Sequence, residues 1–158
     1  MIEEGVRINK YLSEAGVCSR READRLLELG KIRVNGHIPV LGQMISGQDE
    51  VTVDGVKVHL EEKEILIAYH KPKGIVCTCR DEEDSIVKQI DLKERIYPVG
   101  RLDKDSTGLI LLTNNGELMN QILRGKNMHE KEYKVVVNKP VSPEVVKAME
   151  QGVPILGQ

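Results

Sequence analysis

Turn and helix-end signals follow one another closely in the first 60 residues, so this part of the chain can form only short elements. Apolar side chains recur at helical spacing over residues 8–15, and Gly16 supplies a C-terminal stop. Ser19 and Glu22 form a capping box, in which each side chain satisfies a backbone N–H at the start of a second helix. Gly30 ends that helix. The segment is therefore predicted to open with two short helices.

Two pairs of turn residues, Asn35-Gly36 and Asp54-Gly55, separate short apolar segments behind the helices. Both residues of such a pair tolerate positive φ, so each pair is a strong signal for a β-hairpin. The strands of the two expected hairpins cover residues 32–34, 38–40, 51–53 and 56–58. The first unit is thus predicted as two helices followed by a small set of strands.

A charged break at residues 61–64 separates this unit from a longer second one. We expect a first domain at residues 1–62 and a second at residues 63–158. Expected strands of the second domain cover residues 65–69, 75–78, 97–99, 109–112 and 133–137, and expected helices cover residues 86–90, 116–123 and 143–151. The continuous apolar run of the fourth strand is typical of burial on both faces. The predicted fold class is α+β.

Composition limits the kinds of site that the chain can carry. The three cysteines, Cys18, Cys77 and Cys79, and the absence of an apolar leader argue against a disulfide-stabilised secreted protein. Cys77 and Cys79 could bind a metal ion with His70, but their spacing fits two thiols on one strand better, so we expect no metal. No apolar run reaches the roughly 20 residues that a membrane helix needs, and we expect a cytoplasmic protein.

The net charge is −2, so a nucleic-acid site would have to come from a local concentration of cations. The four tyrosines, with no Trp or Phe, exclude a stacking platform built from many aromatic rings. Cations gather around the two expected helices: Arg7, Lys10, Arg20, Arg21, Arg25, Lys31 and Arg33. Such cations can bind phosphates together with the free N–H groups of a helix N-terminus. A solvated helix face paired with nearby acidic residues explains the same charges, and charge alone leaves both interpretations open.

The order and spacing of these signals match a known RNA-binding module. The sequence INKYLSEAGVCSRREADRLLELGKIRVNG, followed by GQDEVTVDG, resembles the α-L RNA-binding domain first described in a small-subunit ribosomal protein. The resemblance covers residues 6–58. It implies a module that binds structured RNA through its basic helix–helix face. The implied contact residues are Arg7, Lys10, Ser19, Arg20, Arg21 and Lys31.

A second polar cluster, GRLDKDSTG, occupies residues 100–108. It places two carboxylates and two cations on a loop directly before an expected buried strand, and a loop held by such a strand can fix a side chain precisely. A surface turn with local salt bridges has the same composition. Composition alone favours that simpler interpretation.

The longer sequence GRLDKDSTGLILLTNNGEL resembles the active-site segment of bacterial RNA pseudouridine synthases that carry an N-terminal α-L domain. The closest group is the enzymes that modify large-subunit ribosomal RNA. KPKGIVCT before this segment and HEKEYKVVV behind it match that family's flanking segments in order. The resemblance implies a catalytic domain with a mixed or antiparallel sheet. It also implies structured ribosomal RNA as substrate, with transfer RNA as a second substrate of some members, and no membrane or DNA partner.

The resemblance implies a role for three residues. Asp103 would be the catalytic carboxylate, acting on the ribose of the target uridine as nucleophile or base. Uracil then detaches, rotates and rejoins the sugar through carbon 5, an isomerisation that needs no cofactor. Arg101 would hold the displaced RNA after the nucleotide is extruded. Tyr133 would stack on the extruded uracil and assist late proton removal; without the resemblance, it is better explained as a half-buried strand residue.

One part of the family pattern is not found in the sequence. The family has a third motif beyond Tyr133, with a basic residue that pairs with the catalytic carboxylate and apolar residues that line the pocket. The sequence stops at VPILGQ before such a motif. We therefore expect an incomplete catalytic domain and little or no turnover from these 158 residues. A non-catalytic RNA-binding module is the alternative function.

Overall fold

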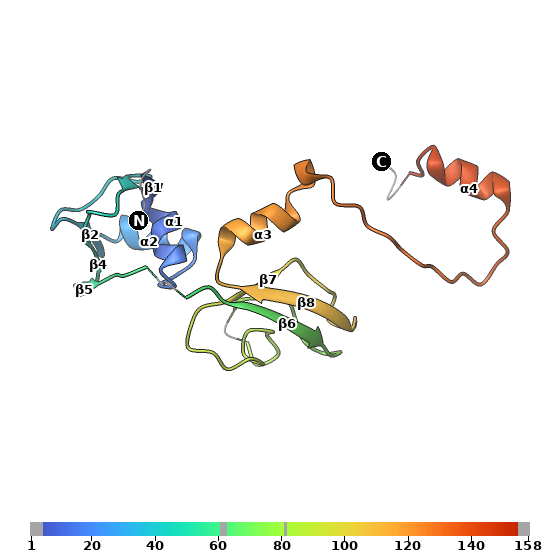
Figure 1. Cartoon of the computed structure of the whole chain (residues 1–158), viewed down its shortest axis with the longest axis horizontal. Helices are drawn as coiled ribbons and strands as arrows, with labels where there is room; N and C mark the ends of the chain where they lie inside the picture. The colour runs from blue at the N-terminus through green and yellow to red at the C-terminus, as the bar shows by residue number, and fades with distance from the viewer. Residues whose placement is uncertain (1–4, 61–62, 81, 155–158) are drawn as a thin grey trace. The chain divides into compact units, whose positions relative to one another are not determined.

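The computed structural model describes residues 5–60, 63–80 and 82–154 (Figure 1). The chain divides into two compact units, Met1–Met128 and His129–Gln158. Part of the expected linker, Glu61 and Glu62, lies outside the described residues, as does the final segment 155–158.

Two short helices lie near the start of the unit Met1–Met128, as the sequence predicts. α1 spans Ile8–Glu14 and α2 spans Arg20–Glu28. The hydroxyl oxygen of Ser19 accepts a hydrogen bond from the Glu22 N–H at 3.2 Å, so Ser19 is the N-cap of α2. The Glu22 carboxylate accepts hydrogen bonds from Arg25. Among the described contacts, therefore, only the Ser19 half of the expected capping box is present.

Five short strands of the first unit form two antiparallel sheets. Their bounds are Val6–Arg7 for β1, Ile32–Val34 for β2, Met44–Ile45 for β3, Val51–Val53 for β4 and Val56–Lys57 for β5. β1 pairs with β3, and β4 lies between β2 and β5. The predicted hairpin between β4 and β5 is confirmed, and its turn residue Asp54 has a φ of 47°.

The expected strand at residues 38–40 is wrong. Asn35 does adopt the left-handed conformation of a turn, with a φ of 50°. Beyond the turn, however, the backbone makes an isolated bridge between Val34 and His37, and β4 takes the place beside β2. The Asn35 side chain supports that pairing, because its oxygen accepts a hydrogen bond from the Glu50 N–H at 2.9 Å. The local signal identified the turn correctly but not the strand partner.

An apolar core joins α1 and α2 to these strands. Its buried side chains are Ile8, Tyr11, Leu12, Ala23, Leu27, Ile32, Val34, Ile45, Val51 and Val58. Burying a large apolar side chain contributes about 1.5–3 kcal/mol. This core therefore fixes the two-helix face against the sheets.

A third antiparallel sheet follows in the same unit. β8 (Gly108–Thr113) lies between β6 (Leu66–Lys71) and β7 (Tyr97–Val99), as Figure 1 shows. β6 extends two residues beyond the expected strand, and its last residue, Lys71, lies opposite Gly108. The predicted α+β fold is confirmed, with antiparallel pairing in every sheet of the described residues.

β8 is buried on one face only, so the expectation of burial on both faces is wrong. Ile110 and Leu112 are 4% and 0% exposed and belong to a core with Ile65, Ile86 and Ile96. Leu109 is 68% exposed. Successive side chains of a strand point to opposite faces, so one face of β8 packs on the core and the other is open in the described part of the chain.

Residues 75–78 and 86–90 form neither the strand nor the helix expected of them. Val76 makes only an isolated bridge, to Ser85. The following segment consists of turns closed by hydrogen bonds between residues three apart, such as the 3.2 Å bond from the Lys88 N–H to the Ser85 carbonyl. Such bonds close single turns, whereas an α-helix needs bonds between residues four apart.

α3 spans Gly116–Leu123, as predicted. The Asn115 side chain caps it by accepting hydrogen bonds from two backbone N–H groups. The 3₁₀ helix η1 (Gly125–Asn127) follows directly after α3. The corner between α3 and η1 carries the polar side chains of Arg124, Lys126 and Asn127.

The second unit contains α4 (Pro143–Glu150), whose predicted cap is confirmed because the Ser142 hydroxyl oxygen accepts from the Val145 N–H at 3.4 Å. The expected strand at residues 133–137 is wrong, since these residues pair with no other described segment. A strand needs a hydrogen-bonded neighbour, which local sequence does not supply. Among the described residues, no helix has the length and apolarity to cross a membrane.

Candidate active site and RNA interface

Asp103 lies in the loop that joins β7 to β8. The two strands pair from Tyr97 opposite Thr113 to Val99 opposite Leu111, and the loop leaves the sheet beyond that point. The Asp103 side chain is exposed, and its backbone carbonyl accepts a hydrogen bond from the Ser106 N–H at 3.0 Å. The sequence thus placed the carboxylate correctly on a loop before β8.

A buried lysine anchors this loop through hydrogen bonds to backbone carbonyl oxygens. Lys71, at the end of β6, is 0% exposed. Its ammonium donates hydrogen bonds to the carbonyl oxygens of Pro72 at 2.9 Å, Ile75 at 2.8 Å and Lys104 at 3.1 Å. All three N–H donors of the ammonium can thus be satisfied by carbonyl oxygens, which makes burial of the charge tolerable. Lys71 therefore ties the residue after Asp103 to the turn that follows β6.

Further contacts fix the backbone on both sides of Asp103. The Leu102 N–H donates to the sulfur of Cys77 at 3.4 Å. The Lys104 carbonyl also accepts from the Gly74 N–H at 2.8 Å. Asp103 is thus an exposed side chain between two anchored residues, which is the arrangement that a positioned catalytic group requires.

The Lys104 side chain adds an ion pair to the loop. Its ammonium lies 2.7 Å from the Asp84 carboxylate. The hydrogen bond from Lys104 holds the pKa of the Asp84 carboxyl below its usual range, and the same contact raises the pKa of Lys104. The ion pair is solvent-exposed, so it orders the loop rather than adding much stability.

Arg101 precedes Asp103 in the same loop and lines a cavity of about 580 Å³. Arg20 of α2 and Tyr97 of β7 line the same cavity, as do the apolar side chains of Met119 and Leu123 in α3. The cavity therefore brings a predicted RNA contact of the two-helix module together with a residue of the Asp103 loop. Its mixture of cations and apolar surface is compatible with both the backbone and the bases of RNA.

Tyr133 belongs to the second unit, where its side chain is 77% exposed. It lies outside regular secondary structure, so the half-buried strand position considered from the sequence does not apply. The role of Tyr133 beside Asp103 stays a prediction.

The cations expected to contact RNA fall into two groups. Lys10 pairs with Glu14 at 3.5 Å, and Lys31 pairs with Asp54 at 3.2 Å. The exposed cations Arg7, Arg20 and Arg21 have no ion-pair partner in the part of the chain that the structure describes. Ser19, the remaining candidate, is exposed but uses its hydroxyl oxygen to cap α2. The arginines at the start of α2 are therefore the cations most available to phosphates.

Comparison with known proteins identifies both halves of this arrangement. The family model described as RNA pseudouridylate synthase matches residues 65–151, which is more than half of the chain. The chain belongs to the RNA pseudouridylate synthase family. The S4 domain model matches residues 6–39, within the segment that resembles the α-L module.

Relatives of known name agree with this family. The dual-specificity RNA pseudouridine synthase RluF of Escherichia coli K12 is 51% identical over 158 residues, which cover 98% of this chain and 54% of that protein. The ribosomal large subunit pseudouridine synthase B of Bacillus subtilis is 37% identical, over 93% of this chain and 62% of that protein. A crystal structure of a pseudouridylate synthase is similar to this chain, with a TM-score of 0.55 and 27% sequence identity. The match covers 97% of this chain and 67% of the chain in that structure. The chain spans between half and two thirds of the length of these two named relatives.

The matched segments leave a gap at residues 40–64, in which the expected domain boundary at residues 62–63 falls. That boundary stays a prediction. The start of the synthase segment is fastened to the end of β8, because the Asn114 side chain accepts from the Ile65 N–H at 2.9 Å and donates to the Lys63 carbonyl at 2.7 Å.

Sequence reasoning missed the residues that hold the Asp103 loop. None of Lys71, Cys77 and Asp84 was assigned a role in holding that loop. The available signal was the position of Lys71 beside an apolar strand, where a buried cation must find several carbonyl oxygens. Cys77 and Cys79 do not share a strand, and no group of three or more metal-binding side chains occurs in the described ranges.

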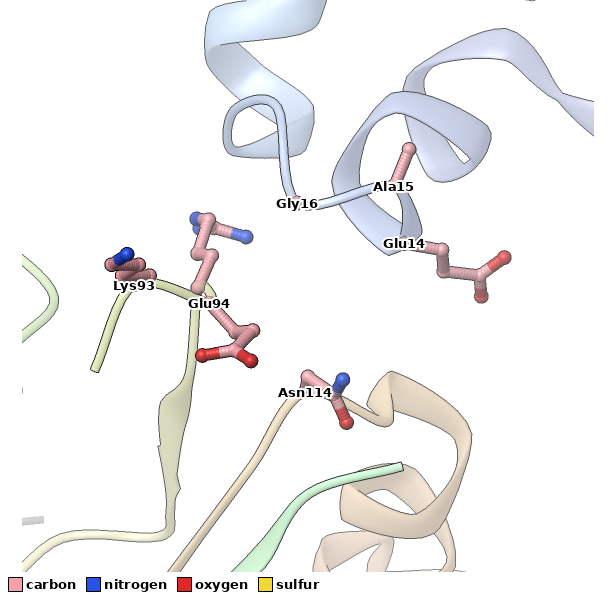
Figure 2. Close-up of a pocket in the computed structure, with 7 residues that line it drawn as sticks. Glu14, Ala15, Gly16, Lys93, Glu94 and Asn114 are labelled. Atoms are coloured by element: carbon pink, nitrogen blue, oxygen red, sulfur yellow. The ribbon is translucent and has the colours of Figure 1, made fainter. Parts of the chain in front are cut away.

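A separate cavity of about 360 Å³ lies away from Asp103 (Figure 2). Figure 2 shows Glu14 and the turn at Gly16 on one side, and Lys93, Glu94 and Asn114 on the other. Asp103, Arg101 and Tyr133 do not line it. Its two carboxylates balance its two cations, Lys93 and Arg95, so the lining has no excess of positive charge for a phosphate backbone and we do not assign it to the candidate active site.

Proposed function

We propose that this protein isomerises uridine to pseudouridine in structured ribosomal RNA, with Asp103 as the catalytic carboxylate. The observation that carries the proposal is the exposed Asp103 side chain between two anchored residues, in the segment that matches the synthase family. The S4-type module supplies RNA affinity. Ribosomal RNA of bacteria is modified in the cytoplasm, which is therefore the proposed location.

In the proposed reaction, the RNA first extrudes the target nucleotide, at a cost of a few kcal/mol. The Asp103 carboxylate then attacks the ribose at C1′, or removes its 2′ proton, and the bond from C1′ to uracil N1 breaks. The released uracil rotates and forms a bond from C5 to C1′. The carboxylate is regenerated, and the proton lost from C5 is balanced by protonation of N1. Product and substrate are isomers, so the reaction needs no oxidant or reductant.

Arg101 has a supporting role in this proposal. Its charged side chain is exposed in the same loop, where it can hold the RNA strand from which the nucleotide was taken. Tyr133 would stack on the extruded base. Transfer RNA, which the family resemblance implies as a substrate of some members, is a second candidate, and the name of the relative RluF, a dual-specificity RNA pseudouridine synthase, is compatible with a second substrate.

The test compares Asp103→Asn with Asp105→Asn in the protein as its gene encodes it. Asp103→Asn keeps the shape of the side chain and removes its charge, so RNA affinity should stay close to wild type. The single-turnover rate, followed by tritium release from C5-labelled ribosomal RNA, should fall by about 10³-fold or more. Asp105→Asn is the matched control and should cost far less.

Two results would reject the catalytic assignment. If Asp105→Asn abolishes turnover while Asp103→Asn retains it, the neighbouring carboxylate is the reactive one. If wild type binds ribosomal RNA but releases no tritium, the protein is an RNA-binding module without this activity.

A further inference from the structure

A basic groove of about 390 Å³ runs between the S4-type helices and the corner that joins α3 to η1. Lys10 and Arg20 line it from the helices, and Arg124 and Lys126 line it from the corner. These four cations face one carboxylate, that of Glu117. The remaining lining side chains are amides: Asn120, Gln121 and Asn127. The groove thus has an excess of positive charge and several neutral hydrogen-bonding groups.

Most of this charge is not neutralised by the protein. Lys10 is paired with Glu14. Arg20, Arg124 and Lys126 are exposed, and none of them has an ion-pair partner within the described ranges. Unpaired cations gathered in one concave surface repel each other, and an anionic ligand would relieve that repulsion.

The backbone of the corner is well determined by hydrogen bonds. The Arg124 N–H donates to the Asn120 carbonyl, the Asn127 N–H donates to the Arg124 carbonyl, and the Met128 N–H donates to the Gly125 carbonyl, each at 3.0 Å. The Asn127 side chain also donates to the Gln121 carbonyl. Arg124 and Lys126 therefore project from a fixed corner rather than from a loose loop.

We propose that this groove binds the phosphate backbone of the substrate RNA and continues the S4-type contact surface onto the synthase part of the chain. The proposal rests on the proposed function, because it names a new contact site for the same RNA. Arginine and lysine contact phosphates, and side-chain amides commonly bond to phosphate and sugar oxygens. Such contacts position the RNA without reading its sequence. The groove accordingly holds the RNA in register for Asp103.

The experiment measures binding of a ribosomal RNA fragment to the Arg124→Gln/Lys126→Gln double variant over a range of salt concentrations. Loss of two phosphate contacts should weaken binding about tenfold near 0.1 M salt and make the plot of log affinity against log salt shallower by about 1.4–1.8. The control is Lys57→Gln/Lys93→Gln, which removes the same charge from exposed positions outside the groove. That control should change affinity by less than about twofold.

The single variant Lys126→Gln should change the slope by about half as much. It tests the same contact surface with a smaller change, in case the double variant does not fold. An equal slope and affinity for wild type and Lys126→Gln would overturn the proposal, as would equal losses in the groove and control variants. Tighter binding of the groove to a polyglutamate peptide than to RNA would overturn it in favour of an acidic protein partner.

Measuring turnover beside binding shows whether the groove assignment or the enzyme assignment has failed. At sub-saturating RNA the single-turnover rate of the groove variant should fall with its affinity, and a higher RNA concentration should recover part of that loss, since the lost contacts are binding contacts. If Asp103→Asn loses turnover but the groove variants bind RNA normally, the groove assignment fails and the enzyme assignment stands. If the groove variants lose affinity but wild type has no turnover, the groove is an RNA site on a protein that is not this enzyme.

Discussion

The ammonium of Lys71 donates a hydrogen bond to the carbonyl oxygen of Lys104 at 3.1 Å, which links the end of β6 to the loop of Asp103. The same ammonium holds two carbonyl oxygens of the turn beyond β6. Because Lys71 is fully buried, no water can replace it at these oxygens without local rearrangement. The conformation of the candidate catalytic loop therefore depends on one lysine that does not itself need to touch RNA.

Lys71→Met should test that dependence. Methionine preserves the length and apolar stem of the side chain but leaves the carbonyl oxygens of Pro72 and Ile75 without this donor. Urea unfolding should show a loss of about 2–4 kcal/mol. The single-turnover rate should fall by about 10²-fold, because Asp103 is displaced from its productive position.

Lys73→Met is the matched control, since Lys73 is exposed and lies two residues further on. It should leave the free energy of unfolding within about 0.5 kcal/mol of wild type. Equal stability of Lys71→Met and Lys73→Met would show that the three hydrogen bonds do not hold the loop.

Arg20→Ala/Arg21→Ala should weaken RNA binding by the S4-type helices. Neither arginine is ion-paired within the described residues, so both are free to contact phosphates. The plot of log affinity against log salt should become shallower by about 1.4–1.8. Arg25→Ala is the comparison, because Arg25 already pairs with Glu22 at 3.0 Å and should contribute less. If all of these variants bind like wild type across the salt range, the contact assignment is wrong.

Several of the elements that the sequence predicted correctly have a local signal at one end or in the turn that joins them. α2 begins at a serine cap, α3 at an asparagine cap and α4 at a serine cap followed by proline. The hairpin of β4 and β5 is closed by Asp54-Gly55. In each case, neighbouring residues along the chain supply the hydrogen bonds that define the element.

The wrongly predicted strands at residues 38–40 and 133–137 both concern pairing across the sequence. Residues 38–40 have suitable apolar side chains, but β2 pairs with β4 instead. Residues 133–137 have high β-propensity and no partner within the described chain. Strand formation depends on such partners, whereas propensity describes only the fit of a side chain to a sheet.

The candidate site could be predicted only in part, because its local motif can be recognised in the sequence and its long-range contacts cannot. The position of Asp103 followed from a continuous motif. The contacts of Lys71 with Lys104, and of Cys77 with Leu102, join residues 33 and 25 positions apart and depend on the β6–β8 register. No local pattern specifies those distances, so the support of the catalytic loop could be seen only in the structure.

Cys77 should support the loop through its sulfur, which accepts a hydrogen bond from the Leu102 N–H at 3.4 Å. Cys77→Ala removes that acceptor and should lower stability by about 1 kcal/mol, with a reduced single-turnover rate. Cys77→Ser keeps an acceptor atom and should recover much of both quantities. Cys79→Ala, at an exposed position, is the control. Identical behaviour of Cys77→Ala and Cys79→Ala in unfolding and turnover assays would rule out this contact as a support.

The ion pair between Lys104 and Asp84 makes a pH-dependent contribution to the same loop. The hydrogen bond lowers the pKa of Asp84 from its ordinary value of 3.8, and raises that of Lys104 from 10.5. A lowered carboxyl pKa contributes stability above pH 3.8, which is lost as pH falls through the folded-state value. A raised lysine pKa contributes below pH 10.5, and its contribution is lost as pH rises through the folded-state value. The pair is therefore intact across the neutral range.

Asp84→Asn should reveal the pH range over which the Asp84–Lys104 ion pair stabilises the protein, in urea unfolding measured from pH 3 to pH 11. The variant should be slightly less stable than wild type by a constant amount between about pH 5 and pH 9. The difference should shrink as the pH falls below 3.8 towards the lowered pKa of Asp84, and as it rises above 10.5 towards the raised pKa of Lys104. Glu83→Gln, one residue away, should show no such profile, because Glu83 has no ion pair in the described part of the chain. A stability difference that stays unchanged at the lowest pH would mean that Asp84 acts through packing or its backbone, and not through its charge on Lys104.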